Sequence, residues 1–446
     1  MHWLLCTSHA TLGFFTRIFI SMHVLFVGFV WPEPTSSAAG QNILSYMNTC
    51  LAIQYNVSFC SAADLTERSH NLTNLGINTF KTALNCNSFN QQIINIKPDI
   101  VVFDRYLSFE QFAWRVKESC PNAMLVLDAE DLHCLREARH KLIKQKQSAQ
   151  ALFMQSDNIL KQENLPLLYN DIALRELACI YQSDLTLLLS TFEHDVLVRY
   201  FNVPANQLSH IPFILPHTNE INAPYRRSFE QKQNFVFIGN FRHAPNYHAV
   251  KILREQCWPK IHNLLKGQFP SVKCEVYGAY MSPKAKQLEN KKIGFVMHGY
   301  AKSQFEAVSS ARVMLAPISF GAGVKGKLLD AMQSHTPSIT TPIGCEGITQ
   351  KSWPGEIVST VDDFVNAAVS FYTQQPKWEN ANEQAKQILD TQYDSHVNAE
   401  VLSKCLQDKY ARFMLDRTTN FNQKLLGHHQ FQTSKYMSQW IEAKNK

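Results

Sequence analysis

Two glycines and two lysines stand together between an apolar run and a helix-like stretch. The apolar run, Val313 to Ala316, is of strand type and is followed by Gly321 and Gly323. Lys325 and Lys327 come directly after the glycines. Glycine lets backbone amides approach a ligand closely, and the start of a helix presents unpaired N–H groups beside which lysines add positive charge. This layout predicts an anion site, and more specifically a phosphate site.

The helix after this loop is expected to carry a polar stripe. If it starts near Gly323, positions 323, 327, 330 and 334 share one face, because they are spaced by four, three and four. One cation, Lys327, and one carboxylate, Asp330, then stand in line with Ser334. This pattern suits the binding of a nucleotide diphosphate. The backbone amides and Lys327 would bind the phosphates, and Asp330 would bind the ribose hydroxyls. The apolar side chains of the stretch would face the core: Leu328, Leu329 and Met332.

Two other interpretations of this segment stay open. A solvated amphipathic helix after an ordinary turn would also show paired lysines. The letters also match G-x-G-x-x-G, as Gly321, Gly323 and Gly326, with Glu346 about twenty residues on, which is typical of dinucleotide dehydrogenases. That fingerprint normally opens a unit at its first strand, whereas at least three strand-like runs precede this one in the same half. Its position therefore argues against a dehydrogenase.

The stretch 234–347 as a whole resembles the donor-binding half of family 4 glycosyltransferases, the glycosyl transferases group 1, which have the two-Rossmann GT-B fold. In that family, strands that end in glycine precede a phosphate loop and a helix with an acidic residue. The positions that match in order are Gly239 with Arg242, Gly278, Gly299, and the segment Gly321 to Asp330.

The resemblance implies a retaining, hexosyltransferase-like enzyme that moves a sugar from a nucleotide diphosphate sugar to an unidentified glycan, lipid or protein acceptor. No cofactor is expected, and no metal is expected because three cationic side chains would supply the positive charge. Arg242, Lys325 and Lys327 would stabilise the leaving diphosphate. The donor would also contact these residues: Gly239, Gly278, Gly299, Gly321, Gly323 and Asp330. Many family members carry two Glu separated by seven residues, but here Ala322 takes the first position and Asp330 the second. The amides of the Gly321 to Gly323 loop would then replace the first Glu.

Three rival functions are weighed against this one. A GT-B enzyme of other chemistry, such as a nucleotide-sugar epimerase, would bind the same donor. A non-catalytic nucleotide-sugar-binding protein would suit the missing first Glu. Asp128, Glu130 and Asp131 could instead form the metal-binding Asp-x-Asp of single-Rossmann glycosyltransferases. Single-Rossmann glycosyltransferases have no second full α/β half, so the metal-dependent interpretation is the weaker one.

Strand-like runs alternate with helical stretches in the amino half, which predicts a doubly wound parallel sheet. The runs are YNVSFC, DIVVFD, AMLVLD, LTLLLS and LSHIPF. Ligands of such sheets lie at the carboxyl ends of the strands. This rule selects four segments: 35–40, 104–105, 128–133 and 190–194. From these we expect Gly40, Asp131 and His133 on the acceptor side.

We expect four parts in the chain: an amino-terminal extension (1–22), an amino-terminal Rossmann-like acceptor domain (23–225), a carboxyl-terminal Rossmann-like donor domain (226–375) and a helical tail (376–446). HVLFVGFV, from His23, reads as a buried first strand, which makes residues 1–21 an upstream extension with Met22 as the true start. A signal peptide is the alternative for this region. The polar stretch between about Asp131 and Glu163 reads as a solvated helix face.

Composition narrows the classes of partner. The net charge of +6 is mild and the chain has no block of five like charges, so no nucleic-acid partner is expected. The eleven cysteines are scattered without a C-x-x-C pair, which suits reduced thiols in the cytoplasm. In the tail, Tyr436, Met437, Trp440 and Ile441 form one apolar stripe. We expect it to be buried on the amino half, although peripheral membrane contact stays open.

Overall fold

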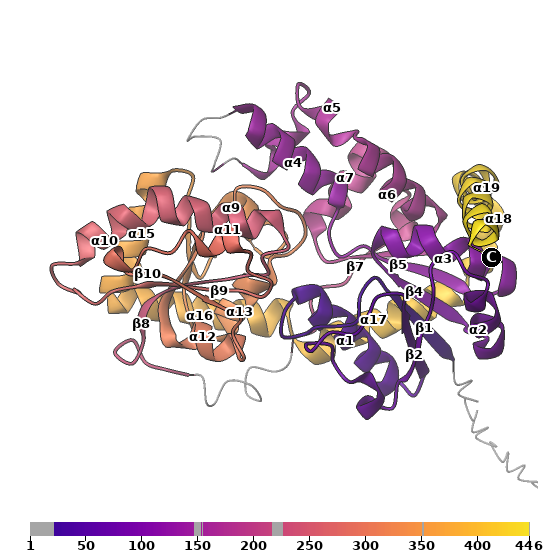
Figure 1. Ribbon diagram of the computed structural model, residues 1–446, viewed down its shortest axis with the longest axis horizontal. Helices are drawn as coiled ribbons and strands as arrows, with labels where there is room; N and C mark the ends of the chain where they lie inside the picture. Colours follow the sequence, from indigo (N-terminus) through magenta and orange to yellow (C-terminus); the bar gives the residue numbers. More distant parts are fainter. Residues whose placement is uncertain (1–21, 147–152, 154, 216–225, 350–351, 446) are drawn as a thin grey trace, which may run out of the picture.

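Two parallel β-sheets with flanking helices form the body of the protein (Figure 1). The computed structural model describes residues 22–146, 153, 155–215, 226–349 and 352–445. Residues 1–21, expected as an upstream extension, and residues 216–225, the end of the expected amino-terminal domain, lie outside them.

The first sheet has seven strands in the order β3-β2-β1-β4-β5-β6-β7. The strands are β1 (His23–Gly28), β2 (Asn56–Ser61), β3 (Asn78–Lys81), β4 (Ile100–Asp104), β5 (Met124–Asp128), β6 (Leu185–Leu188) and β7 (Leu208–His210). All neighbours pair in parallel, which confirms the doubly wound sheet expected from the alternating runs. The short strand β3 was not predicted, because its polar sequence NTFK has no buried face.

Helices cover both faces of this sheet. They are α1 (Ala38–Ala52), α2 (Ser88–Ile96), α3 (Arg105–Ser119), α4 (His133–Lys146), α5 (Leu165–Leu168), α6 (Asp171–Gln182) and α7 (Thr191–Phe201). Alternate side chains of β1 enter different cores: Leu25 and Val27 pack in the cluster of α3 and α6, and Val24 and Phe26 in that of α1. Burial on both faces explains why β1 is an unbroken apolar run.

The second sheet has six parallel strands in the order β10-β9-β8-β11-β12-β13. Its strands are β8 (Gln233–Ile238), β9 (Cys274–Tyr277), β10 (Phe295–Gly299), β11 (Ala311–Ala316), β12 (Ser338–Thr340) and β13 (Gly355–Ile357). The glycine loop follows β11, the fourth strand of this sheet in chain order, and not the first strand β8. This position is wrong for a dinucleotide fingerprint, as the sequence indicated.

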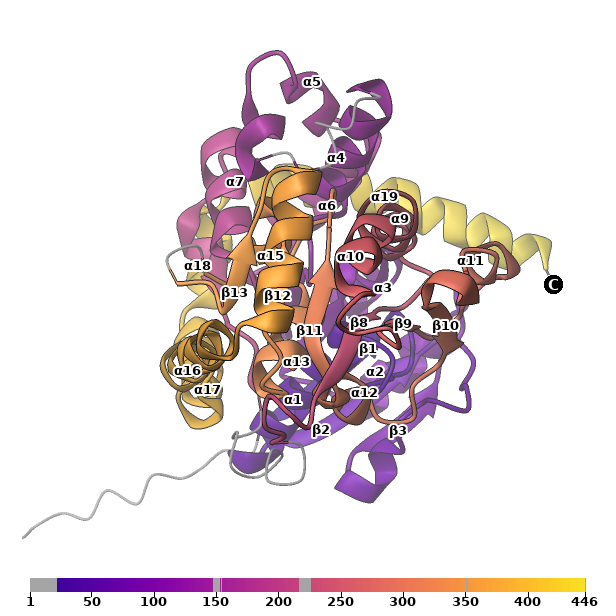
Figure 2. The same cartoon turned by 90° about the vertical axis from the view of Figure 1, so that its left-hand side faces the viewer.

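The helices of this half are α9 (Ala244–Ile252), α10 (Trp258–Leu265), α11 (Pro283–Lys286), α12 (Gln304–Ser310), α13 (Gly326–Gln333), α14 (Pro342–Cys345) and α15 (Val361–Thr373). Figure 2 shows α10 and α15 in front of one face of the sheet. Helix α13 starts at Gly326 and not near Gly323, because Gly323 has a left-handed φ of 64°. Leu328, Leu329 and Met332 are buried in the core, as predicted.

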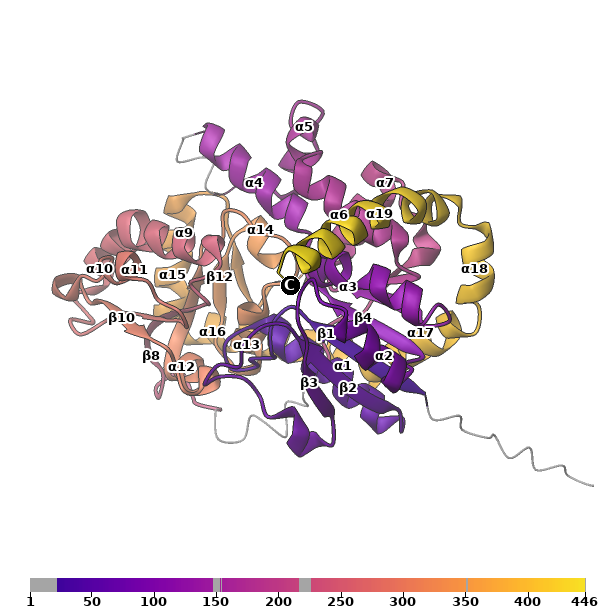
Figure 3. The ribbon, with the colours of Figure 1, turned by 45° about the vertical axis from the view of Figure 1, so that its right-hand side comes forward.

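The tail consists of four helices that touch both halves (Figure 3). They are α16 (Gln375–Gln392), α17 (Ser395–Tyr410), α18 (Phe413–Thr419) and α19 (Phe421–Lys444). Helix α16 packs on α13 and α15, whereas α17 packs on α1, and α19 packs on α6 and α3. The chain therefore returns from the second sheet to the first after α16.

The predicted burial of the apolar stripe on α19 is wrong. Tyr436 and Trp440 are 61% and 60% exposed. The inner face of α19 is held by polar contacts instead: Arg115 Nη2 donates to Ser438 Oγ (2.9 Å), and Gln423 Nε2 donates to Asp184 Oδ1 (3.0 Å). Because these hydrogen bonds fix the rotation of the helix, the aromatic side chains point outward. No helix in the described part of the chain has the length and apolar character needed to cross a membrane.

Candidate active site

A cavity of about 630 Å³ lies between the two halves, where the carboxyl ends of both sheets meet. Loops after β1, β2, β4 and β5 line it from the amino half, and loops after β8, β9, β10 and β11 from the carboxyl half. Most of the predicted donor-side residues line it: Gly239, Gly278, Gly321, Gly323, Asp330, Arg242, Lys325 and Lys327. Gly299 ends β10 and lies outside the lining, although its neighbour Tyr300 belongs to it.

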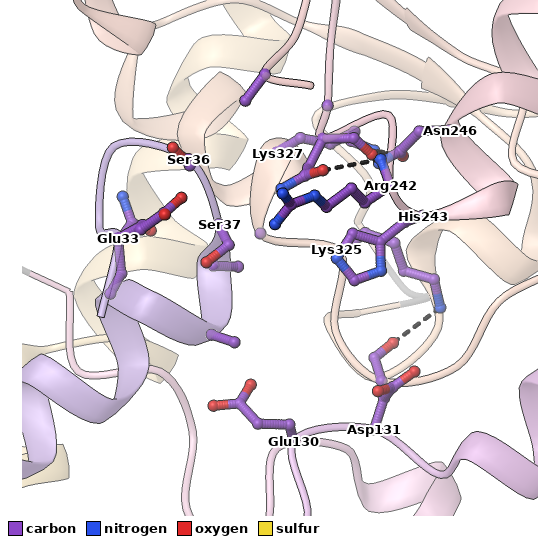
Figure 4. A pocket seen from close by; sticks show the side chains of 18 of the residues that line it. Glu33, Ser36, Ser37, Glu130, Asp131, Arg242, His243, Asn246, Lys325 and Lys327 are labelled. Carbon is purple, nitrogen blue, oxygen red and sulfur yellow. Dashed lines mark hydrogen bonds between the residues drawn. The ribbon is translucent and has the colours of Figure 1, made fainter. Parts of the chain in front are cut away.

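Lys327 is the cation of α13 that faces the cavity most directly (Figure 4). Its Nζ donates to Asn246 Oδ1 on α9 and lies 5.0 Å from the centre of the Phe237 ring. Burial lowers the pKa of Lys327 to about 7. An anion placed beside Nζ would favour its charged form, so the site is prepared for a phosphate.

Asp330 lies one helical turn from Lys327 on the same face of α13. It is hydrogen-bonded to Gln304 Nε2 at 3.3 Å. Burial raises the pKa of Asp330 to about 7, although the nearby Lys327 opposes this rise. In the loop after β8, the Arg242 guanidinium stacks 3.5 Å from the centre of the Tyr280 ring. Three of the predicted groups, Arg242, Lys327 and Asp330, are thus presented to one space.

Lys325 is more constrained than the sequence predicted. Its Nζ donates to the carbonyl of Gly323 (2.8 Å) and lies 3.9 Å from Glu346 Oε1. The side chain is buried, and burial lowers the pKa of Lys325. This lysine lines the cavity but also ties the loop to Glu346, so it has a structural role besides any contact with a ligand.

The expectation that the Gly323 amide is free for a phosphate is wrong. Its N–H donates to Glu193 Oε1 at 2.7 Å, and the same oxygen accepts from Leu132 N at 3.0 Å. Glu193 stands on α7 of the amino half and is buried; burial raises its pKa to about 8. It falls in the selected segment 190–194, but no local pattern pairs it with a glycine 130 residues away.

A buried ion pair joins the two halves behind the glycine loop. Arg139 on α4 donates from Nη1 and Nη2 to the two carboxylate oxygens of Glu346, at 2.9 Å and 2.6 Å. The same two nitrogens donate to the carbonyls of Gly321 (2.7 Å) and Ser156 (2.8 Å). Both side chains are almost fully buried. Arg139 lies in the polar stretch that we expected to be a solvated face, and for this residue that expectation is wrong. A bidentate partner satisfies its charge inside the protein.

A second set of contacts links the halves on the other side of the cavity. The Tyr280 hydroxyl donates to Glu33 Oε1 (2.8 Å), and the Tyr300 hydroxyl donates to Thr35 Oγ1 (3.0 Å). The Arg68 guanidinium lies 4.9 Å and 4.7 Å from the centres of these two tyrosine rings. The loops after β1 and β2 are therefore joined to the loops after β9 and β10.

On the acceptor side, Asp131 and His133 line the cavity as expected. Asp131 forms an ion pair with Arg136 and lies 3.5 Å from His133 Nε2. Burial opposes ionisation of Asp131, but Arg136 and His133 outweigh it and lower its pKa, whereas burial lowers the pKa of His133 to about 4. Gly40 does not line the cavity. It lets α1 approach the Glu33 backbone, where an added Cβ would come within 2.7 Å.

Asp128, Glu130 and Asp131 do not form a common ligand set. Asp128 is buried beside Asp104 in the sheet and does not line the cavity, whereas Glu130 and Asp131 do. Burial raises the pKa of Asp128 well above its ordinary value, and that of Glu130 to about 7. Among the described residues, no group of three or more His, Cys, Asp or Glu side chains is arranged to hold a metal ion.

Residues 232–374 match the family model of the glycosyl transferases group 1. The fold resembles three glycosyltransferase structures. Sucrose-phosphate synthase from Thermosynechococcus elongatus is 12% identical with a TM-score of 0.61, over 87% of this chain and 99% of that one. HepE from Anabaena, solved with UDP-glucose, is 11% identical with a TM-score of 0.59, over 87% and 100%. TarM from S. aureus, solved with UDP among its ligands, is 12% identical with a TM-score of 0.53, over 72% and 58%.

These similarities confirm the predicted family resemblance and the GT-B fold. The chain spans 58% of the length of TarM but nearly all of the other two structures. No curated protein matches the chain in sequence.

Proposed function

We propose that this protein, a glycosyltransferase whose residues 232–374 belong to the glycosyl transferases group 1, transfers a hexose from a nucleotide diphosphate sugar to a hydroxyl acceptor with retention of configuration. The observation that carries the proposal is the position of Lys327, Asp330 and Arg242 around one cavity of the GT-B cleft. HepE was solved with UDP-glucose, so uridine diphosphate sugars are the first donors to test.

In the proposed reaction, the bond between the anomeric carbon and the diphosphate oxygen breaks through an oxocarbenium-like state. Negative charge then grows on the leaving diphosphate. Arg242 and Lys327 would face this charge, and Lys325 would add to the field from behind the loop. Fixed cations in a site closed to water stabilise such charge more strongly than they would in solution. Asp330 would accept hydrogen bonds from the ribose hydroxyls.

We also propose that the transfer needs no divalent metal, because three cations already surround the diphosphate position. Activity should survive an excess of EDTA. Loss of activity with EDTA, and its return with manganese, would contradict this part of the proposal. The search for ligands would then return to Glu130 and Asp131.

The proposal places the protein in the cytoplasm. Each of the ten cysteines in the described part of the chain is a free thiol, which suits a reducing compartment. The acceptor, whether a glycan, a lipid or a protein, is not specified by these residues, and peripheral membrane contact is compatible with the proposal.

A panel of nucleotide sugars tests the function. The purified protein is incubated with UDP-glucose, UDP-N-acetylglucosamine and GDP-mannose, and the free nucleotide and the sugar product are measured with and without candidate acceptors. Nucleotide release that rises with an acceptor supports transfer. An epimerised nucleotide sugar would identify an epimerase instead, and nucleotide binding without any turnover would identify a binding protein.

A further inference from the structure

Glu130 occupies a special place in the cavity, at the end of β5. It follows Asp128, the last residue of that strand, and its carboxylate lines the cavity although the residue is only 7% exposed. Its backbone has a left-handed φ of 60°, which is uncommon for a residue other than glycine and costs free energy. Such strain concentrates at functional sites. The conformation directs the side chain into the space between α1 and the loop that carries Lys325 (Figure 4).

One hydrogen bond orients the Glu130 carboxylate. Asn42 Nδ2, on α1, donates to Glu130 Oε1 at 3.0 Å. Asn42 is completely buried, and its own Oδ1 has no hydrogen-bond partner among the described atoms. The amide is therefore committed to Glu130. In the described part of the chain, Asn42 is the sole hydrogen-bond partner of this carboxylate, so Oε2 is left for a ligand.

Glu130 also lies directly against the glycine loop. A Cβ added to Gly323 would come 3.2 Å from the Glu130 carbonyl oxygen and 2.7 Å from Asp131 Cβ. This contact, made by the Glu130 backbone, places the residue at the edge of the glycine loop but on the amino-half wall of the cavity. Retention with direct transfer requires the acceptor oxygen to approach the anomeric carbon from the face that the diphosphate leaves. A carboxylate on the wall opposite the donor side of the cavity is well placed to meet that oxygen.

We propose that Glu130 is a catalytic residue that binds the acceptor hydroxyl and takes up its proton. This inference rests on the proposed function. As the acceptor oxygen forms its bond to the anomeric carbon, the bond from that carbon to the diphosphate breaks and its electron pair leaves with the diphosphate. The hydroxyl proton passes to a Glu130 oxygen. Solvent or the departing diphosphate then removes the proton from Glu130, so that the carboxylate is restored.

The electrostatic surroundings agree with this role. Burial raises the pKa of Glu130 to about 7, and Arg105 opposes the rise. A group whose pKa is near the working pH is both ionised often enough and basic enough to accept a proton. The charged and titratable groups that face it are Arg105 and Asp104 at the end of β4, Asp128 and Asp131 in its own segment, and Tyr46 on α1.

The test compares Glu130→Gln with wild type in the release of nucleotide from UDP-glucose, UDP-N-acetylglucosamine and GDP-mannose, with water as the acceptor. Gln keeps the oxygen that accepts from Asn42 but cannot take up a proton. We expect release to fall by about 100-fold or more. Azide, an anionic nucleophile that needs no deprotonation, should restore release to within about tenfold of wild type and give a glycosyl azide of retained configuration.

Two controls separate this role from a structural one. Asp128→Asn replaces the neighbouring buried carboxylate, which lies outside the cavity and whose pKa burial raises well above its ordinary value. It should keep release close to that of wild type. Glu130→Gln should also bind UDP or GDP as wild type does, since Glu130 contacts the acceptor and not the diphosphate.

Several outcomes would overturn the inference. Unchanged release by Glu130→Gln would show that no proton passes to this residue. Azide that fails to restore release, while nucleotide binding is intact, would exclude a role in deprotonation. An inverted glycosyl azide would make Glu130 the nucleophile of a double displacement. If wild type releases no nucleotide from any donor, in water or in azide, and binds none, the proposed function fails instead.

Discussion

In the carboxyl-half wall of the cavity, the charged groups come mainly from one loop and its helix, whereas in the amino-half wall they come from separate elements. Lys325, Lys327 and Asp330 follow one another after β11. Glu33 follows β1, and Glu130 follows β5. A site built from one segment can be recognised in the sequence by the spacing of its residues. A site assembled from distant segments has no such spacing. The first wall is also cationic, and the second is rich in carboxylates.

The largest effect is expected where the two walls are joined. Arg139→Ala removes two hydrogen bonds from the buried Glu346 carboxylate and leaves it beside Lys325 at 3.9 Å, so it should lower the free energy of unfolding by about 3 to 5 kcal/mol. Urea unfolding at pH 7 measures this change. The double variant Arg139→Met with Glu346→Leu removes both charges and should be less destabilised than Arg139→Ala. If the single and double variants have the same free energy of unfolding, the ion pair does not account for the stability of this junction.

The next effect concerns the carboxyl-half wall alone. Lys327→Ala and Asp330→Ala should each weaken binding of UDP or GDP by about 1.5 to 3 kcal/mol, because each removes a charge-assisted contact. Calorimetry on the folded variants measures it. Lys284→Ala is the matched control, since Lys284 is an exposed lysine of the same half outside the cavity. Unchanged affinity in both cavity variants would move the nucleotide away from α13.

These two walls also differ in how far the sequence could predict them. The alternation of strands and helices, the glycine loop and the apolar face of α13 follow from periodicity and spacing, which are local properties. The bond from the Gly323 amide to Glu193 depends on two segments that meet only in the folded chain. The pairing of Arg139 with Glu346 has the same origin. A polar residue on a helix carries no sign of a distant buried partner, so its burial could not be foreseen.

Glu193, which binds the Gly323 amide behind the cavity, gives a pH test of the junction between the two halves. Its folded-state pKa is raised to about 8, so its contribution to stability is fully present below its ordinary pKa and is lost as the pH rises through 8. Gln can still accept both N–H groups at Oε1 and carries no charge to bury. The free energy of unfolding of Glu193→Gln should therefore rise relative to that of wild type between pH 5 and pH 8, by on the order of 2 kcal/mol. Urea unfolding across this range measures the difference. Parallel curves for the two proteins would mean that Glu193 ionises normally.

The smallest effect is expected on the outer face of α19. Here too, the local sequence pattern and the contacts with distant residues lead to different expectations. Trp440 belongs to an apolar stripe that the local pattern would bury, yet it is 60% exposed, with Lys444 Nζ 5.2 Å from its ring centre. Trp440→Ser should lower the free energy of unfolding by no more than about 0.5 kcal/mol. Against the inner side of the helix, Arg115 on α3 donates to Asn87, Asn90 and Ser438. Arg115→Ala should cost about 1 to 3 kcal/mol because the buried Ser438 hydroxyl loses its partner. Thermal unfolding of both variants compares the two faces. A larger loss from Trp440→Ser than from Arg115→Ala would show that the stripe, and not the polar face, holds α19 to the amino half.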